Sequence, residues 1–354
     1  MSTDLASVNT AFDKREFINF LRGLAVFLML WGHSVQYCTG GQFDFFENIV
    51  FKIIYSFHMP FFMLISGYLF FFSEQKRGMF ELIEYKGKSL LYPILMCSLL
   101  NLLLTQGVFV VSGGGYPALI GAIPINSLWF IWSVLACSIA LALAMKLSSN
   151  LFIQGLLVVI CIPFAALFPN WDMNVWMYPY FVIGYLYARN EEWLRKYRSI
   201  IGIASSLIYI IMLFFFEKKH YIYTTSLLGG ETRLESIAID FFRWAIGLFG
   251  SVAVVWLCGF MYARIRKGKV GAVIEKLGKH SLAVYALSVS LLSFWLPRFA
   301  NKCLSVLPWL NWNKYIWVYN VILTPLVAVA YSLLFLWIIK GLKKIGAYRL
   351  IFGR

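Results

Sequence analysis

The stretch Arg22-Gly-Leu-Ala-Val-Phe-Leu-Met-Leu-Trp-Gly-His33 places an arginine and a histidine inside a segment with the composition of a membrane-spanning helix. At roughly 100° and 1.5 Å per residue, their spacing amounts to three helical turns plus about 20°. Both side chains therefore lie on one helical face, about 16 Å apart along the axis. Ionisable groups inside a span are costly and usually face the bundle interior or a wet cavity. The pair marks a candidate functional site.

The whole chain has the composition of a polytopic membrane protein. Of its 354 residues, 61% are hydrophobic and 13% are charged, and its mean hydropathy is +0.75. Soluble domains carry roughly 25% charged residues. The six cysteines show no CxxC or metal-ligand spacing, so we interpret them as small buried hydrophobes and predict no metal site. The first dozen residues lack an apolar core, so we expect the first helix to act as an uncleaved insertion signal.

Apolar runs of about 17–25 residues predict membrane-spanning helices. Ten such runs predict an all-α fold in a single transmembrane domain over 1–354, with short cytoplasmic tails at 1–15 and 341–354. The runs cover roughly 17–37, 49–72, 89–111, 127–146, 151–168, 175–188, 199–216, 239–262, 281–297 and 315–339.

The distribution of basic residues predicts the orientation of these helices. With the N-terminus in the cytoplasm, the cytoplasmic segments hold 22 Lys and Arg and the outer loops hold 6. This asymmetry follows the positive-inside rule and indicates that both termini are cytoplasmic. It also accounts for the net charge of +15 as membrane topology, so we expect no nucleic-acid partner. We expect a multi-pass protein of the inner or plasma membrane.

In this orientation Arg22 lies in the cytoplasmic half of the first helix and His33 toward the outer half. Imidazole is the side chain best suited to acid–base catalysis near neutral pH, so His33 is the candidate catalytic base. The structural alternatives are an arginine that snorkels to the interface and a histidine bonded to a backbone carbonyl.

The second span contains His58 at a depth similar to that of His33. Pro60 interrupts the helical hydrogen bonds there, and Gly67 permits close helix packing. We predict that the two histidines share one cavity and that His58 is a further catalytic candidate. The alternative is a structural histidine that caps carbonyls freed by Pro60. Ser66 has no identifiable base beside it, so we do not expect a serine nucleophile.

Two lysines precede the third span, in Tyr85-Lys86-Gly87-Lys88. Lys86 and Lys88 lie on the same predicted side as Arg22, and such a cluster suits an anionic cytosolic ligand. The alternative is that both lysines serve only the positive-inside signal.

Other polar residues are weaker candidates. Asp240 and Arg243 lie one turn apart in the eighth span, so we expect them to pair with each other. The outer loop 217–238 contains His220 and would serve either as a lid over an outward cavity or as a plain loop. The tryptophans near the outer face suit either sugar stacking or, as we favour, the interfacial belt; they are Trp171, Trp176, Trp309 and Trp312.

The ordered set of these motifs resembles the integral-membrane acyltransferase-3 family, which includes O-antigen and exopolysaccharide O-acetylases and succinylases. The resemblance rests on Arg22 and His33 with ten residues between them, on the Ser56-Phe-His58-Met-Pro-Phe-Phe stretch with Ser66-Gly67-Tyr68, and on the Lys86-x-Lys88…Tyr92-Pro93 entry to the third span. Further matching pieces are Ser127-Leu-Trp-Phe-Ile-Trp, Phe181-Val-Ile-Gly-Tyr and Leu277-Gly-Lys-His-Ser281-Leu-Ala-Val-Tyr285. The resemblance spans nearly the whole chain, and ten helices with cytoplasmic termini is the usual architecture of the family.

The chain departs from the family pattern at two positions. The family often has an acidic residue three positions before the arginine, where this chain has Asn19, so no carboxylate there can orient the site. Ser288 stands where the family usually has a histidine, so we do not expect that histidine to be needed here.

The resemblance implies transfer of an acyl group, usually acetyl from acetyl-CoA, to a hydroxyl of a cell-surface glycan or its lipid-linked precursor. The donor would be a substrate, with no permanently bound cofactor. Arg22, Lys86 and Lys88 would bind it, and His33 would deprotonate the acceptor hydroxyl. A covalent acyl-histidine ranks second, because the sequence offers no separate base to activate it. The alternative function is a transporter or flippase of glycan or lipid intermediates that uses the buried charges as a proton relay.

Overall fold

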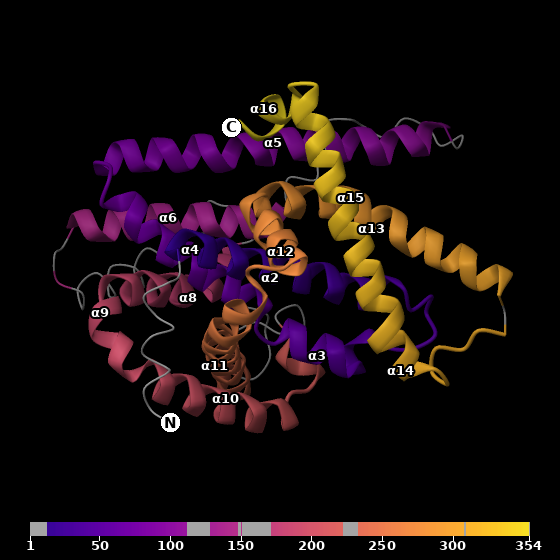
Figure 1. Cartoon of the computed structure of the whole chain (residues 1–354), viewed down its shortest axis with the longest axis horizontal. Helices are drawn as coiled ribbons and strands as arrows, with labels where there is room; N and C mark the ends of the chain where they lie inside the picture. The colour runs from indigo at the N-terminus through magenta and orange to yellow at the C-terminus, as the bar shows by residue number, and fades with distance from the viewer. Residues whose placement is uncertain are drawn as a thin grey trace.

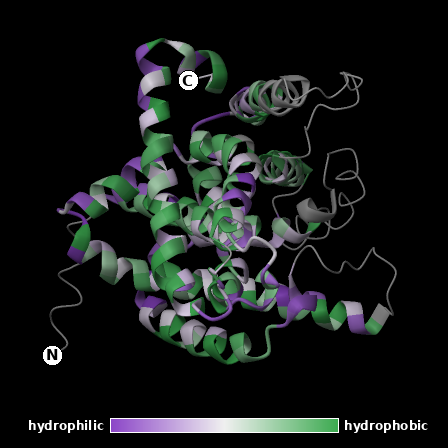
Figure 2. Ribbon diagram, turned by 90° about the vertical axis from the view of Figure 1, so that its right-hand side faces the viewer, coloured by the Kyte–Doolittle hydropathy of each residue, from purple (hydrophilic) through white to green (hydrophobic). Residues whose placement is uncertain are grey.

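The computed structural model describes residues 13–111, 128–147, 150, 171–221, 233–307 and 309–353, and within these ranges the secondary structure is entirely helical. Figure 1 shows the arrangement, and Figure 2 shows hydrophobic residues along most of the helices. The helical class predicted from the sequence is confirmed for this part of the chain.

The first helix, α2 (Lys14–Tyr37), is the central element of the fold. Its N-cap Asp13 accepts a hydrogen bond from the backbone N–H of Arg15, which satisfies one of the free donors at the helix start. The helix packs against elements from both halves of the chain. These neighbours are α3 (Ile49–Tyr55), α4 (His58–Glu74), α12 (Lys269–Lys279), α13 (Ser281–Val306) and α15 (Thr324–Lys344).

The second predicted span is broken into two helices. α3 ends at Tyr55 and α4 begins at His58, so the helical hydrogen bonds stop just before Pro60. Proline has no N–H and its ring clashes with the preceding turn, but it is tolerated in the first turn of a helix. The break therefore falls two to four residues upstream of Pro60, and it places His58 at a helix start.

Two pairs of helices cross at contacts that only glycine permits. A Cβ on Gly67 of α4 would lie 1.9 Å from the carbonyl oxygen of Phe181 in α8 (Trp171–Arg189), and a Cβ on Gly184 would lie 2.1 Å from that of Leu64. This confirms the packing role predicted for Gly67.

The second crossing joins α12 to α2. A Cβ on Gly278 would lie 1.7 Å from the carbonyl oxygen of Asn19, and a Cβ on Gly23 would lie 1.8 Å from that of Ile274. The backbones of the two helices are therefore in direct contact beside Arg22, as is usual where small residues line a membrane-helix interface.

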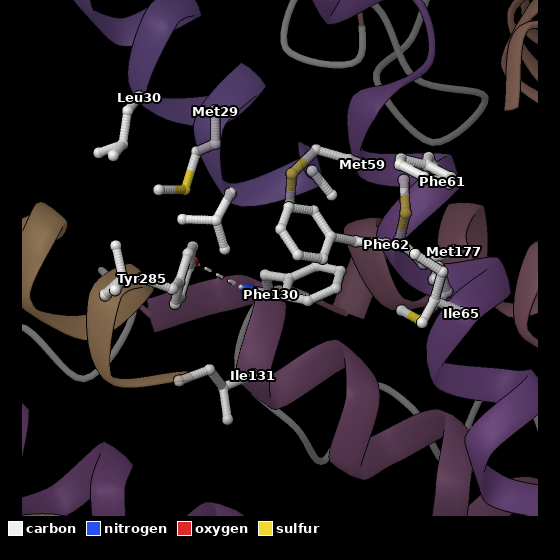
Figure 3. Packing of buried hydrophobic residues seen from close by; sticks show 14 of the residues in the cluster. Met29, Leu30, Met59, Phe61, Phe62, Ile65, Phe130, Ile131, Met177 and Tyr285 are labelled. Carbon is white, nitrogen blue, oxygen red and sulfur yellow. Dashed lines mark hydrogen bonds between the residues drawn. The ribbon is translucent and has the colours of Figure 1, made fainter. Parts of the chain in front are cut away.

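The hydrophobic core lies between α2, α4, α6 (Trp129–Leu147) and α13. Figure 3 shows Met29 of α2, Phe62 of α4, Phe130 of α6 and Tyr285 of α13 facing one another. The Tyr285 hydroxyl accepts a hydrogen bond from the Phe130 N–H at 3.4 Å, at the start of α6. The core thus unites the first third of the chain with its last third.

The remaining elements complete the bundle. α10 (Arg198–Phe214) packs on α11 (Arg233–Ile265), and α16 (Ala347–Phe352) lies beside α5 (Met79–Val111), as Figure 1 shows. The short elements are η1 (Phe45–Glu47), α9 (Glu191–Leu194), η4 (Arg195–Tyr197), η5 (Lys218–His220), α14 (Ile316–Val318) and the π-helical turn η6 (Tyr319–Leu323).

Seven helical segments of the described residues are long and apolar enough to cross a membrane, and they coincide with seven of the ten predicted spans. They are Lys14–Tyr37, Ile49–Glu74, Trp129–Leu147, Glu191–Phe214, Leu234–Ile265, Ser281–Val306 and Ile316–Lys344. The predicted spans 89–111 and 175–188 are helical within α5 and α8 but are not among the seven, and the span 151–168 lies outside the described residues. The protein is a multi-pass membrane protein, and the count of ten stays a prediction.

Polar contacts join loops and tails that are distant in the sequence, and these loops and tails fall into two groups. Lys14 pairs with Glu191 at 2.6 Å, and both residues lie in segments predicted to be cytoplasmic. The Tyr92 hydroxyl, near the start of the predicted third span, donates to the carbonyl of Leu350 in the predicted cytoplasmic tail. Contacts among the predicted outer segments are those of Lys218 with Asp44 and of Gln42 with the Leu310 carbonyl, and Asn48 of the first outer segment bonds to Asn320 in the predicted tenth span. These contacts agree with the predicted grouping of the loops. The two groups define an Arg22 end and a His33 end of the molecule.

Candidate active site

His33 is held by two neighbours through one ring nitrogen. Its Nδ1 lies 3.1 Å from Gln36 Oε1 and 3.0 Å from the Tyr55 hydroxyl, and its ring stacks on Tyr37 with the planes 3° apart. With the amide oxygen of Gln36 facing the ring, a proton on Nδ1 gives this contact its donor, and Nε2 is then the basic nitrogen. An amide and a phenol therefore orient this histidine, where the sequence had suggested only that a carboxylate was missing.

The position of Tyr55 depends on Gly32, the residue before His33. A Cβ on Gly32 would lie 2.5 Å from the Tyr55 ring, so the glycine makes room for that ring against α2. The ring stacks on Phe51, with centroids 3.8 Å apart, and lies 4.5 Å from the His58 ring. Tyr55 thus stands between the two histidines and contacts both.

His58 is 2% exposed, and its Nδ1 lies 3.1 Å from the carbonyl oxygen of Ile54. Because a carbonyl only accepts, Nδ1 carries the proton and Nε2 is the remaining acceptor. Ile54 is in the last turn of α3, so His58 caps a carbonyl at the helix break, as the structural alternative expected. A catalytic role of His58 through Nε2 stays a prediction.

A small cavity lies on the side of Tyr55 away from α2. It measures about 30 Å³, room for about two water molecules. Its walls come from α3, α4, α8, η5 and α11, and they include Tyr55, His58, Trp176, Tyr180, His220 and Arg243. His58 thus lies in the cavity wall. His33 is not one of the lining residues, but it contacts Tyr55, which is.

Arg243 hydrogen-bonds the η5 segment that contributes His220 to the wall of this cavity. Its guanidinium donates from Nε to the carbonyl of His220 at 3.0 Å and from Nη2 to that of Lys219 at 3.1 Å. Nη1 lies 3.2 Å from Asp240 Oδ1, which confirms the predicted pair, and both side chains are buried. The carboxylate offsets the cost of burying the guanidinium, while the guanidinium holds the η5 turn on α11.

His220, in the cavity wall, has a pKa below the usual value of a histidine. Burial, followed by the charge of Lys219, lowers the pKa of His220 to about 4. Its Nδ1 accepts a hydrogen bond from the Glu217 N–H at 2.9 Å, so the neutral ring carries its proton on Nε2. The loop 217–238 therefore contributes His220 to the cavity wall, while its residues 222–232 lie outside the described residues.

The tryptophans predicted to lie in the interfacial belt have different environments. Trp176 lies in the cavity wall with its ring 5.5 Å from the Arg243 guanidinium carbon. Trp312 is 9% exposed and Trp309 is 72% exposed, as a belt residue would be. Sequence position alone did not separate these cases, because the periodicity of α8 does not reveal which helix packs on Trp176.

At the Arg22 end, the guanidinium of Arg22 donates from Nη2 to Ser281 Oγ at 2.6 Å. Its neighbour is thus the start of α13, which follows the glycine crossing of α12. Lys86 lies over the Phe70 ring at 5.5 Å, and Lys88 pairs with Glu84 on the exposed face of α5. Lys88 therefore forms an ion pair with a carboxylate of its own helix.

Two serines discussed from the sequence have local roles. Ser66 Oγ donates to the Phe62 carbonyl at 2.9 Å, and Ser288 Oγ donates to the Tyr285 carbonyl at 2.7 Å. Both bonds are of the kind that serine makes within its own helix. Ser288 also lies 4.0 Å from Met29 Sδ on α2, so it packs in the core.

The chain was compared with known proteins. The sequence profile of a family described as an acyltransferase domain, Acyl_transf_3, matches residues 15–343. Nodulation protein NolL of Mesorhizobium japonicum is 26% identical over 283 residues, which are 75% of this chain and 74% of that protein. Nodulation protein NolL of Sinorhizobium fredii is 25% identical over 281 residues, 75% of each chain. No solved structure matches.

Proposed function

The chain belongs to the Acyl_transf_3 family of acyltransferases, and from this premise we propose that it moves an acyl group, most readily acetyl, from a cytosolic acyl-CoA to a hydroxyl of a cell-surface glycan or its lipid-linked precursor. The resemblance to polysaccharide O-acetylases supports the glycan hydroxyl as acceptor. The apolar helices support a place in the inner or plasma membrane.

One observation carries the catalytic part of the proposal, namely the fixed orientation of His33. Gln36 and Tyr55 engage Nδ1, so Nε2 is free to act as a general base. In the reaction, Nε2 takes the proton of the acceptor hydroxyl while its oxygen attacks the thioester carbonyl. The carbon–sulfur bond breaks, an ester forms, and the CoA thiolate leaves and receives the proton from the imidazolium.

Arg22 has a different task in this proposal. Eleven helical positions separate it from His33, so the two side chains lie about 16 Å apart and cannot contact the same reacting carbon. An acyl-CoA carries its acyl group at the end of a long pantetheine arm, far from its phosphates. We therefore assign Arg22, with Lys86 and Lys88, to the phosphate-bearing part of the donor.

The decisive experiment uses purified protein in detergent with labelled acetyl-CoA and a glycan acceptor. We expect acylation without any membrane gradient, and we expect His33→Ala and Arg22→Ala each to abolish it while the protein still inserts and accumulates. Ser66→Ala, which removes only a hydroxyl bonded within its own helix, is the matched control and should retain activity. A strict requirement for sealed vesicles would favour a transporter, and near wild-type acylation by the His33 variant would exclude the general base.

A further inference from the structure

Basic side chains from three separate helices converge at the Arg22 end. His280 lies between α12 and α13, and its Nε2 is 3.1 Å from Lys343 Nζ of α15. Lys276 and Lys279 come from the last turn of α12, and Arg22 of α2 reaches the adjacent Ser281. We call these five residues, Arg22, Lys276, Lys279, His280 and Lys343, the basic cluster.

The electrostatics of the cluster are those of like charges held together. Burial, followed by the charges of Lys343, Lys276, Lys279 and Arg22, lowers the pKa of His280 to about 4. Within the described parts of the chain, none of the ion pairs involves Lys276, Lys279 or Lys343, and all three are exposed. A group of cations held close together attracts anions from solution.

The glycine crossing holds this cluster in place. Gly278 lies between Lys276 and Lys279, and its backbone rests on the carbonyl of Asn19, one turn before Arg22. The crossing thus fixes the last turn of α12 above the arginine. A positive-inside signal alone would need lysines in the loop but would not need them fixed beside a half-buried arginine.

Neighbouring hydroxyls add hydrogen-bond donors of the kind a phosphate requires. Ser281 is the first residue of α13, whose N-cap makes no side-chain hydrogen bond, and Tyr348 lies 3.3 Å from His280 Nδ1. Helix starts favour anions through their free N–H groups and the helix dipole. Ammonium groups, a guanidinium, hydroxyls and a helix start form together the donor set of a polyphosphate site.

We propose that the basic cluster binds the phosphates of the nucleotide part of the acyl donor. This inference rests on the proposed function and assigns the phosphates to α12, α13 and α15, in addition to the lysines of α5. Arg22 would form the floor of the site, at the point where the donor's arm enters the bundle toward His33.

The test compares two donors that differ only in the nucleotide. The triple variant K276Q/K279Q/K343Q is assayed with acetyl-CoA and with acetylpantetheine, which lacks the phosphates. We expect KM for acetyl-CoA to rise about tenfold or more, with a smaller change in kcat and none in KM for acetylpantetheine. The control K269Q/K340Q/K344Q removes the same charge from exposed positions on α12 and α15 and should behave as the unmodified protein. An unchanged KM for acetyl-CoA, or an equal rise with both donors, would overturn the proposal.

Two further arms separate the possible sources of phosphate and the two proposals. In nanodiscs of phosphatidylcholine alone the KM effect should persist; an effect confined to discs containing phosphatidylglycerol would assign the cluster to lipid headgroups and overturn the donor assignment. Calorimetry with desulfo-CoA should show binding to the unmodified protein that the triple variant weakens, whether or not transfer occurs. If binding is present but no acylation is found, the proposed function fails alone; if acylation is present but binding is equal in the variant, only the phosphate site fails.

Discussion

The two ends of α2 differ in burial and in charge. At the His33 end, aromatic rings lie against His33 and His58, and the buried pair of Arg243 with Asp240 is held to backbone carbonyls. At the Arg22 end, the lysines of the basic cluster are exposed and form no ion pair within the described residues, and rigidity comes from two backbones in contact. In the proposed reaction, the enclosed end would carry out proton transfer and the exposed end would bind the anionic donor.

The largest effect should come from filling the glycine crossing at the Arg22 end. Gly278→Leu would force a side chain into the Asn19 carbonyl, 1.7 Å from the new Cβ. Because neither backbone can yield without separating the helices, we expect loss of activity and a destabilisation above about 3 kcal/mol. Thermal unfolding in detergent and acylation should both report it. Gly259→Ala, in the interior of α11 with nothing near its Cβ, should retain both stability and activity, and an equally stable Gly278 variant would show that the crossing is dispensable.

At the His33 end, the comparable effect should follow removal of the buried cation. Arg243→Met leaves Asp240 buried without its partner and frees the η5 turn, so we expect a loss of about 3 kcal/mol in unfolding free energy. Replacing both residues in Arg243→Met/Asp240→Leu should recover much of that loss, since no uncompensated charge remains. Thermal unfolding of the single and double variants measures this. Additive losses in the double variant would contradict a charge-pair origin.

A smaller and more specific effect is expected from Tyr55→Phe. The substitution keeps the ring against Phe51 and His58 but removes the hydroxyl at 3.0 Å from His33 Nδ1. We expect kcat to fall on the order of tenfold, with little change in KM or stability, because the imidazole loses part of its orientation. The acidic limb of the pH–rate profile should also shift. An unchanged kcat and profile would show that Gln36 alone orients the base.

The smallest effects concern two histidines, one at each end, whose pKa values are both lowered to about 4. For His220 and His280 alike, burial is the first cause, so the folded protein disfavours their protonation. Their contribution to stability is therefore complete above the unfolded pKa of about 6.5 and is lost as the pH falls toward 4. The surrounding charges differ, because four cations act on His280, whereas Glu217 partly opposes Lys219 at His220.

An added anion should distinguish them. In the His220→Asn variant, where His280 remains, pyrophosphate should reduce the loss of unfolding free energy between pH 6.5 and 4. In the His280→Gln variant, pyrophosphate should leave that loss unchanged. Thermal unfolding as a function of pH in both variants provides the measurement. An equal response of the two variants to pyrophosphate would show that the ends do not differ in anion binding.

Sequence periodicity predicted the helices but not the partners of the site residues. Hydropathy located the seven helices that are long and apolar enough to span a membrane, because each carries its own signal. Pro60 predicted an interruption of the second span, and Gly67 predicted a close helix contact. The break appeared upstream of Pro60 because the missing N–H affects the preceding turn. Tyr55 was not identified, since its role depends on the space beside Gly32, which is a property of two packed helices.

The basic cluster was missed for a related reason. Lys276, Lys279 and Lys343 fit the positive-inside signal, so their charge was already explained by topology. Only the folded arrangement places residues so distant in sequence around one histidine. Of the candidates chosen from the sequence, Arg22 and His33 both lie in α2, and Lys88 pairs with Glu84.

The bond between Arg22 and Ser281 joins residues 259 positions apart, and this has a consequence for biogenesis. The first helix enters the bilayer early, while the residues that accept its arginine are still unsynthesised. At 5–20 residues per second, translation needs roughly 13–50 s more to produce them. During that interval the nascent chain lacks the hydroxyl that accepts a hydrogen bond from Arg22 in the folded protein. This contact between the first helix and α13 therefore forms only after most of the chain has been made.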